Sequence, residues 1–383
     1  MKLNSDLATE IINKTMPVLG KNINIMNEVG IIIGSGNKDR IDTYHEVAEK
    51  VIGKDKTYII NQKESNIYQG VKAGINLPIK FNNEIIGVVG ITGKAEEVSG
   101  YGKLVKNMVE LILQQKFLQR EIELENRAKE NFYQQLLSNS INDEEMLQDR
   151  IDLLEINTDI SRVVILIQIF PFNNRKLAKQ VDYLKNTNQI NNNEDILLVR
   201  GENIVLIKTL SSNIDYKQNK EIIKTANKIK DKSIKEFESV KLGISSVFNN
   251  LTNIFYSYKE AKHALKIANK VYNKKNKEIY YSKNLGFDYF LPFFNSFSMS
   301  YYFEHLFDCN IIHMFEETRL GETINTLVNN DLNITKAAEE LYVHRNTLLY
   351  RIKKIKECTG FDLKNAEDLF TLLFVYHFYL YYK

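Results

Sequence analysis

Two short stretches near the amino terminus contain residue types that bind anions. Ser35, Arg40 and His45 lie within SGNKDRIDTYH, directly after an apolar run. A guanidinium group can hold a carboxylate with two parallel hydrogen bonds, and a hydroxyl or an imidazole can supply a further donor. In VKAGINLPI, Gly74 precedes Pro78, and glycine would allow backbone N–H groups to approach an oxygen closely. Together the two stretches predict a site for a small acid that carries a carboxylate at each end.

The same residues also have ordinary roles. Arg40 could form an ion pair at the surface, and His45 could be a satisfied residue of a helix. The chemistry of these side chains alone does not separate such roles from a ligand site.

Residues 333–356 near the carboxyl terminus have the spacing of a helix-turn-helix. Apolar residues repeat at i, i+3, i+4 and i+7 from Ile334, and again at i, i+4 and i+7 from Leu348. Asn333 is the expected N-cap of the first helix, and the second helix should begin near residue 345. Two short helices that meet through one apolar cluster are the anatomy of this motif.

The outward face of the second helix is basic, because residues 345–356 contain five cations and no acidic residue. In a major groove, cations bind phosphates and short polar groups reach base edges. We expect Arg351 and Lys354 to contact phosphates, and Asn346, Thr347 and Tyr350 to lie nearest the bases. A solvated basic face on an ordinary helical hairpin is the alternative. The predicted DNA-binding set is Arg345, Asn346, Thr347, Tyr350, Arg351, Lys353 and Lys354.

The sequence offers no catalytic arrangement. It contains no G-x-S-x-G, no H-E-x-x-H and no complete phosphate loop, since GITGK at residues 90–94 lacks the longer loop. Cys309 and Cys358 have no metal-ligand spacing and are too few for a disulfide framework, which indicates a reducing compartment. We therefore expect no metal, no other cofactor and no enzymatic activity.

Composition limits the class of protein. A net charge of +3 over 383 residues is nearly neutral, so any attraction to nucleic acid must come from a local patch. The longest apolar run, residues 369–382, is too short to span a bilayer, and no secretory signal is visible. The expected protein is soluble and cytoplasmic, with no membrane partner and with two or three domains.

The elements that must position the anion-binding residues form a small domain. The pattern predicts a helix at residues 5–19, a hairpin over 22–36 with its turn at Asn27 and Glu28, a helix at 43–52 and a strand at 57–61. A second hairpin is predicted from INLPIKF and EIIGVVGIT, joined by Asn82 and Asn83, which tolerate positive φ. This order predicts an antiparallel sheet with helices packed against it, as in a PAS-like sensor.

One long helix is predicted from about residue 98 to residue 139. Its apolar residues, among them Leu104, Leu111 and Leu118, recur at steps of three and four without a sustained heptad. The helix could cover its own domain, or it could form a parallel pair across a dimer that carries the sensor's state toward DNA. We predict the second role. Beyond it, strands at 162–170, 195–199, 203–208 and in KLGISS alternate with helices at 143–156, 176–186, 216–237 and 252–272, which predicts an α/β middle domain.

The carboxyl-terminal motif resembles a known family. The pattern A-A-x-x-L-x-V-H-x-N-T-L-x-Y-R-[IL] of the PucR and sugar-diacid regulators is present from Ala337 to Ile352. Tyr342 takes a place where many other helix-turn-helix proteins have glycine, and an aromatic residue is usual in this family.

The amino-terminal stretches SGNKDRIDTYH, KAGINLPI and GVVGITG are similar, at matching spacing, to the diacid-recognition domain of the sugar-diacid regulators. The resemblance implies an effector such as glucarate, galactarate or glycerate. One difference is Asp42, which replaces the glycine of the family's R-I-G-T-x-H pattern and places an acidic group beside the implied carboxylate site. By resemblance, the ligand role falls on Ser35, Arg40, His45, Gly74, Ile75, Asn76, Leu77 and Thr92.

The middle domain resembles the GGDEF-like domain of the same regulators, best in LGISSVFNNLTNIFYSYKEAKHAL. Where a cyclase has Gly-Gly-Asp-Glu-Phe, this chain has R-G-E-N at residues 200–203, and its first strand ends in F-P-F at 170–172 without a metal-binding carboxylate. Magnesium-assisted phosphoryl transfer needs such carboxylates. The domain is therefore expected to be a folded spacer or a dimerisation unit.

These observations predict an α+β, multidomain protein. Its parts are a PAS-like antiparallel-sheet sensor at residues 1–115, a helical coupler at 116–155, a degenerate GGDEF-like α/β domain at 156–285 and an all-α helix-turn-helix domain at 286–383. The predicted function is that of a homodimeric, ligand-responsive transcriptional regulator, with operator DNA and a small hydroxy acid or diacid as partners. Two alternatives stay open: a nucleotide-signalling enzyme of the GGDEF type, and a PucR-like regulator that senses a purine or an amino-acid metabolite.

Overall fold

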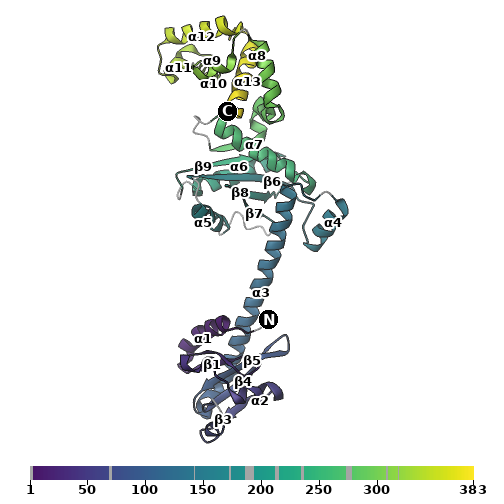
Figure 1. The fold of residues 1–383 in the computed structure, drawn as a ribbon, viewed down its shortest axis with the longest axis vertical. Coiled ribbons are helices and arrows are strands. Elements are labelled where there is room, and N and C mark those ends of the chain that lie inside the picture. Colours follow the sequence, from purple (N-terminus) through teal and green to yellow (C-terminus); the bar gives the residue numbers. More distant parts are fainter. Residues whose placement is uncertain are drawn as a thin grey trace. The chain divides into compact units, whose positions relative to one another are not determined.

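The computed structural model describes residues 3–383 except 69–70, 142, 172–173, 186–193, 212–214, 234–236, 273–277, 308 and 318. The chain forms two compact units, Met1–Arg127 and Ala128–Lys383 (Figure 1). Each contains helices packed on a five-stranded sheet, and the second also contains an all-helical part. The predicted α+β, multidomain class is confirmed.

The sheet of the first unit is antiparallel throughout, with the order β2-β1-β5-β4-β3. The strands are β1 Ile23–Met26, β2 Ile32–Ser35, β3 Tyr58–Ile60, β4 Gly74–Phe81 and β5 Glu84–Thr92. One face forms a core with helix α1 Ser5–Leu19 and the first part of helix α3 Ala95–Leu137. The other face forms a smaller core with helix α2 Glu46–Lys54. The PAS-like assignment of this unit stays a prediction.

The second hairpin of this unit has the turn that its sequence predicts. Asn82 and Asn83 connect β4 and β5 with φ angles of 50° and 66°. Asparagine tolerates this left-handed conformation better than most residues, and two such residues in succession match the right-handed twist of a hairpin. The turn sets the register of the first pairs, Phe81 with Glu84 and Lys80 with Ile85, and a β-bulge between Ile79 and Lys80 then shifts the pairing by one residue for the rest of the two strands.

The second unit contains the middle sheet, whose order is β10-β9-β6-β8-β7. Its strands are β6 Arg162–Phe170, β7 Ile196–Arg200, β8 Asn203–Thr209, β9 Ser239–Ile244 and β10 Ile279–Tyr281, and only the β9–β10 pairing is parallel among those described. Helices α5 Asn174–Lys185 and α6 Asp215–Ser233 cover one face. The last turns of α3, with α4 Glu144–Leu153 and α7 Ile254–Lys270, cover the other. The predicted positions Phe172 and Asn186 lie outside the described residues.

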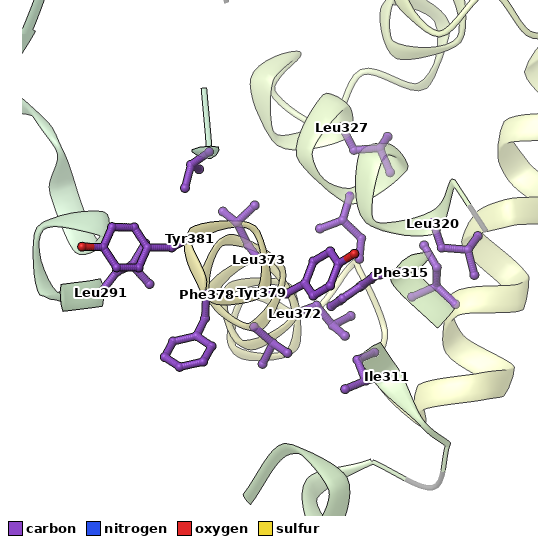
Figure 2. Close-up of a cluster of buried hydrophobic side chains, with 14 of the residues drawn as sticks. Leu291, Ile311, Phe315, Leu320, Leu327, Leu372, Leu373, Phe378, Tyr379 and Tyr381 are labelled. Atoms are coloured by element: carbon purple, nitrogen blue, oxygen red, sulfur yellow. The ribbon is translucent and has the colours of Figure 1, made fainter. Parts of the chain in front are cut away.

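The carboxyl-terminal helices pack around α13 Ala366–Tyr382. Side chains from several sides of α13 reach neighbours such as Ile311, Leu320 and Leu327 (Figure 2). The other elements here are η5 Gly286–Phe293, α8 Ser296–Leu306, α9 Ile311–Glu317, α10 Leu320–Asn329, α11 Ile334–Glu340 and α12 Arg345–Thr359. In the part of the chain that the structure describes, none of the helices combines the length and the apolar composition needed to cross a bilayer.

Candidate ligand site and nucleic-acid interface

A row of polar residues crosses the sheet of the first unit on the face that α2 covers. Ser35 on β2 is opposite Asn24 on β1, Asn24 is opposite Gly90 on β5, and Gly90 is opposite Asn76 on β4. Residues paired across antiparallel strands project to the same side of the sheet. The side chains of Asn24, Ser35 and Asn76 are 3%, 9% and 3% exposed, so the row lies inside the protein.

Hydrogen bonds fix one end of this polar row. The Ser35 hydroxyl donates to Asn24 Oδ1 at 2.6 Å, and it accepts the backbone N–H of Asn37 at 3.1 Å. The glycine in the middle of the row leaves room for its neighbour, since a Cβ atom at Gly90 would lie 2.7 Å from Asn76 Oδ1. The row is thus a fixed set of polar groups with one small position at its centre.

Arg40 and His45 add charge and a further donor to the same domain. Arg40 ends the short turn η1 Lys38–Arg40, which follows β2, and His45 is the residue before α2; their side chains are 9% and 3% exposed. Burial and the nearby charge of Arg40 lower the pKa of His45 to about 4, and burial lowers the pKa of Arg40. Among the described residues, His45 Nδ1 is buried without a hydrogen-bond partner. The Arg40 guanidinium can donate hydrogen bonds to an anion, and a neutral His45 can do so in the tautomer that has its proton on Nδ1.

The structure divides the other predicted ligand residues between the two faces of the sheet. Gly74 and Thr92 are paired with each other and lie on the same side as Asn76. Ile75 and Leu77 are buried in the opposite core with α1 and α3, so their side chains cannot join Asn76 in a site. A Cβ atom at Gly74 would clash with the carbonyl oxygen of Ile91, so close strand packing is sufficient to require glycine there.

The backbone of β4 also differs from expectation. Residues 74–76 are paired with β3 on one side and β5 on the other. Their amides therefore lie within the sheet, and the prediction that they are exposed to an anion is wrong.

The site contains one residue that sequence reasoning missed, Asn24. The signal was present, because in the alternating run Ile23, Asn24, Ile25 a polar residue holds a position inside a short strand that is buried throughout. Asp42, the difference from the family pattern, has φ 64° and is exposed. This left-handed conformation explains why the family has glycine there.

The helix-turn-helix has the geometry that its pattern predicts. The Asn333 side chain accepts the N–H of Lys336 at 3.1 Å, which confirms it as the N-cap of α11. At the start of α12, His344 Nδ1 accepts the N–H of Asn346 at 3.3 Å. The two helices meet through a buried cluster formed by Ala337, Ala338, Leu348 and Ile355.

The turn between these helices has an unusual residue. Tyr342 has φ 54° and its side chain is 95% exposed. Its backbone conformation is the left-handed one that glycine adopts without cost, which explains why glycine is frequent there in other proteins with this motif. The aromatic ring contributes little packing to offset the strain.

The outward face of α12 presents most of the predicted DNA-binding residues. Arg345, Asn346, Thr347, Tyr350 and Lys353 are exposed, and Lys354 is half-buried. An exposed aliphatic side chain, Leu349, lies among them and was missed; such a group can contact the methyl group of thymine.

Arg351 is a partial exception on this helix. It is half-buried and donates to the Thr323 hydroxyl at 3.4 Å, so it also ties α12 to α10. Its phosphate contact stays a prediction.

The described residues of the middle domain form no comparable constellation. The R-G-E-N segment forms the turn between β7 and β8, with φ 59° at Gly201, and the Arg200 guanidinium lies 4.9 Å from the ring centroid of Tyr258. Within the described ranges, no group of three or more His, Cys, Asp or Glu residues could hold a metal ion.

Comparison with known proteins matches each part of the chain. Residues 3–136 match the sugar diacid recognition family, residues 138–267 the GGDEF-like domain and residues 320–377 the PucR C-terminal helix-turn-helix domain. The carbohydrate diacid regulator of Escherichia coli is 28% identical over 382 residues, which cover 96% of this chain and 95% of that protein. This chain is a transcriptional regulator of the sugar-diacid regulator type.

Other relatives of this sugar-diacid regulator also match over most of the chain. An uncharacterised protein of Haemophilus influenzae is 27% identical over 375 residues, covering 97% of this chain and 98% of its own. The DNA-binding transcriptional activator AdeR of Bacillus subtilis is 22% identical over 311 residues, covering 79% of this chain and 72% of its own. Similarity thus extends through the sensor, the middle domain and the helix-turn-helix of the regulator.

The buried imidazole of the regulator predicts a pH dependence of stability. His45 has a pKa of about 4 in the folded protein against 6.5 for the free side chain, so between these values only the unfolded chain binds the proton. The free energy of unfolding should fall as the pH falls from 6.5 to 4. His45→Gln should remove part of this slope in urea titrations at several pH values. His263, whose pKa is also lowered to about 4, accounts for a remaining slope. An identical slope in parent and variant would contradict the assignment.

The strained turn predicts a stabilising substitution. Tyr342→Gly should raise the free energy of unfolding by about 1 kcal/mol, because glycine relieves the left-handed strain and little packing is lost. Tyr342→Ala is the matched control, since it removes the ring but keeps the Cβ atom and should bring no gain. Thermal unfolding of the full chain measures both. A lower free energy of unfolding in Tyr342→Gly would show that the ring makes a stabilising contact.

Proposed function

We propose that this regulator binds a small hydroxy acid or sugar diacid, of the glucarate, galactarate or glycerate type, in its first unit and binds operator DNA through α12 as a homodimer. Residues 1–115 are the sensor, 116–155 the coupler, 156–285 a middle domain without catalytic activity and 286–383 the DNA-binding domain. The observation that carries the proposal is the buried set Asn24, Ser35, Arg40, His45 and Asn76.

The chemistry of this set favours an anionic, hydroxyl-bearing effector. Arg40 offers a planar fork for a carboxylate, and His45 Nδ1 is an unused polar atom beside it. The hydroxyl of Ser35 and the amides of Asn24 and Asn76 extend away along the sheet and suit the hydroxyl groups of a sugar acid. A purine could form hydrogen bonds with the amides of Asn24 and Asn76. It would bring no negative charge to the buried guanidinium of Arg40.

Strand β4 connects this set to α3, because its successive side chains project to opposite faces of the sheet. Asn76 projects to the effector side of β4, whereas its neighbours Ile75 and Leu77 project to the other side. There α3 approaches closely: a Cβ atom at Gly102 would lie 3.0 Å from Ile75 Cδ1 and 3.3 Å from Leu77 Cδ1. Because protein interiors are close-packed, a shift of β4 on effector binding would be felt at α3. The effector changes the regulator only through its different affinity for the two positions.

Operator binding follows from the face of α12. Its exposed Asn346, Thr347 and Tyr350 can approach base edges, while Arg345, Lys353 and Lys354 can pair with phosphates. The salt bridge from Lys353 to Glu357, 3.4 Å long, is exposed and weak enough to exchange for a phosphate. Two copies related by a two-fold axis would require an approximately palindromic operator.

The sensor proposal predicts a selective loss of effector response. Glucarate, galactarate or glycerate should raise the midpoint of thermal unfolding, since a ligand at one hundred times its Kd stabilises a protein by about 2.7 kcal/mol. Arg40→Ala should abolish this shift. Lys38→Ala, an exposed cation in the same turn, should retain it. If no acid of the panel stabilises the parent protein while a purine or an amino acid does, the sensor assignment is wrong.

The DNA-binding proposal predicts a change in salt dependence. Lys354→Ala should weaken binding to all duplexes and lower the slope of log K against log salt by about 1, because one phosphate contact is lost. Lys356→Ala serves as the control, since Lys356 is paired with Asp362 at 2.7 Å and should contribute less. Fluorescence anisotropy at several salt concentrations, with duplexes from upstream of the gene and scrambled duplexes, supplies the slopes. Equal slopes in parent and Lys354→Ala would exclude the phosphate contact.

A further inference from the structure

Helix α3 has two separate apolar faces within the first unit. Val105, Val109 and Leu113 are fully buried against the sheet. A second set is exposed to solvent, with Leu104 54%, Leu111 63%, Leu118 58% and Ile122 57% exposed. Tyr101, 51% exposed, lies at the start of the same set. Isolated apolar side chains are common on surfaces, but a continuous line of them indicates an interaction site.

The exposed set follows a heptad. Together with the half-buried Met108 and the polar Gln115, it occupies positions 101, 104, 108, 111, 115, 118 and 122, so the steps alternate strictly between three and four residues. This spacing keeps side chains on one seam over about 33 Å of helix. The residues are Tyr101, Leu104, Met108, Leu111, Gln115, Leu118 and Ile122, with the three leucines at equivalent d positions.

We propose that this exposed seam pairs with the same seam of a second copy of the chain, as a parallel two-stranded coiled coil. The inference deepens the proposed function, because it identifies the surface that forms the homodimer. In a parallel arrangement the two copies of the sensor lie side by side, and the two α3 helices run in the same direction from amino to carboxyl terminus.

Gln115 is the one polar residue of the seam. It favours pairing with the seam of a second copy in a parallel, in-register arrangement. Gln115 lies at an a position, where in a parallel pair it faces Gln115 of the other copy and the two amides can hydrogen-bond. In an antiparallel pair that is not centred on Gln115, this residue would lie opposite apolar residues of the other seam, and its amide would be buried without a polar partner. A polar residue at one a position therefore selects both partner and register, at some cost in affinity.

The flanks of the seam allow two copies to approach. The neighbouring e and g positions include Asn107, Gln114, Gln119 and Glu121, so only one of these four side chains is charged. Helix α1 contacts a different side of α3, where Lys116 pairs with Glu10 at 3.0 Å, and leaves the seam uncovered. A seam of this length buries roughly 1,000 Å² over two copies, which is the minimum area expected of a specific interface.

Cysteine cross-linking tests both the surface and the direction. In a full-length chain with Cys309→Ser and Cys358→Ser, Leu104→Cys and Leu118→Cys should each form a disulfide-linked dimer under mild oxidation, because identical positions meet in a parallel pair. Leu124→Cys is the control, since Leu124 is 57% exposed on the same helix but outside the seam. Cross-linking only in a mixture of Leu104→Cys and Leu118→Cys would show an antiparallel pair and overturn the proposal.

Charge insertion tests the seam without cysteine chemistry. The double variant Leu111→Glu, Leu118→Glu should sediment as a monomer, whereas Leu124→Glu should remain a dimer. A double variant that stays dimeric, or a parent protein that is monomeric at micromolar concentration, would overturn the seam. The acid-dependent shift in thermal unfolding, measured on the same variants, separates the two proposals: a monomer that still responds to the acid retains the sensor function. Circular dichroism establishes that each variant is folded.

Discussion

The packing of α3 against strand β4 is the contact on which the organisation of this regulator depends. Val105, Val109 and Leu113 bury one side of the helix in the sensor core, and Gly102 allows it to approach Ile75 and Leu77. That single orientation determines which side chains of the helix remain exposed. It also connects the helix to the strand that presents Asn76 on its other face. The last turns of α3 are buried again, in the core of the middle domain, through Phe132, Tyr133 and Leu136.

The sequence predicted elements well where local chemistry determines them. The bounds of α1 were predicted to the residue, the Asn82 and Asn83 turn has the predicted backbone, and Asn333 caps its helix. What the sequence could not show is which face of an element meets a neighbour. Ile75 and Leu77 are next to Asn76 in the chain but on the opposite side of the sheet. The apolar residues of α3 lacked a clear period because two stripes of different phase overlap, one buried and one exposed. The two stripes can be distinguished only when the face of α3 that packs against the sheet is known.

A buried network of hydrogen bonds lies within the apolar core of the carboxyl-terminal helices and adds a directional constraint on their packing. Asp288, 1% exposed, accepts a hydrogen bond from the Tyr272 hydroxyl and lies 2.7 Å from His377 Nδ1. These residues come from the end of the middle domain, from η5 and from α13. Buried polar groups are stable only when their partners are in place, so this network links correct packing of α13 to the segment that precedes it. The helix-turn-helix, which shares this apolar core through Leu348 and Ile355, depends on that arrangement.

The edges of the sensor sheet are short. At one edge, β3 has three residues; at the other, β2 has four, and the following loop lies along it, since Ile32 donates its N–H to the carbonyl of Thr43 and accepts from Asp42. An open strand edge is a template on which another chain can add a strand, and proteins limit such edges to avoid uncontrolled polymerisation. Neither edge here offers a run long enough for that. Contacts between copies of the sensor would therefore use side-chain surfaces and not strand pairing.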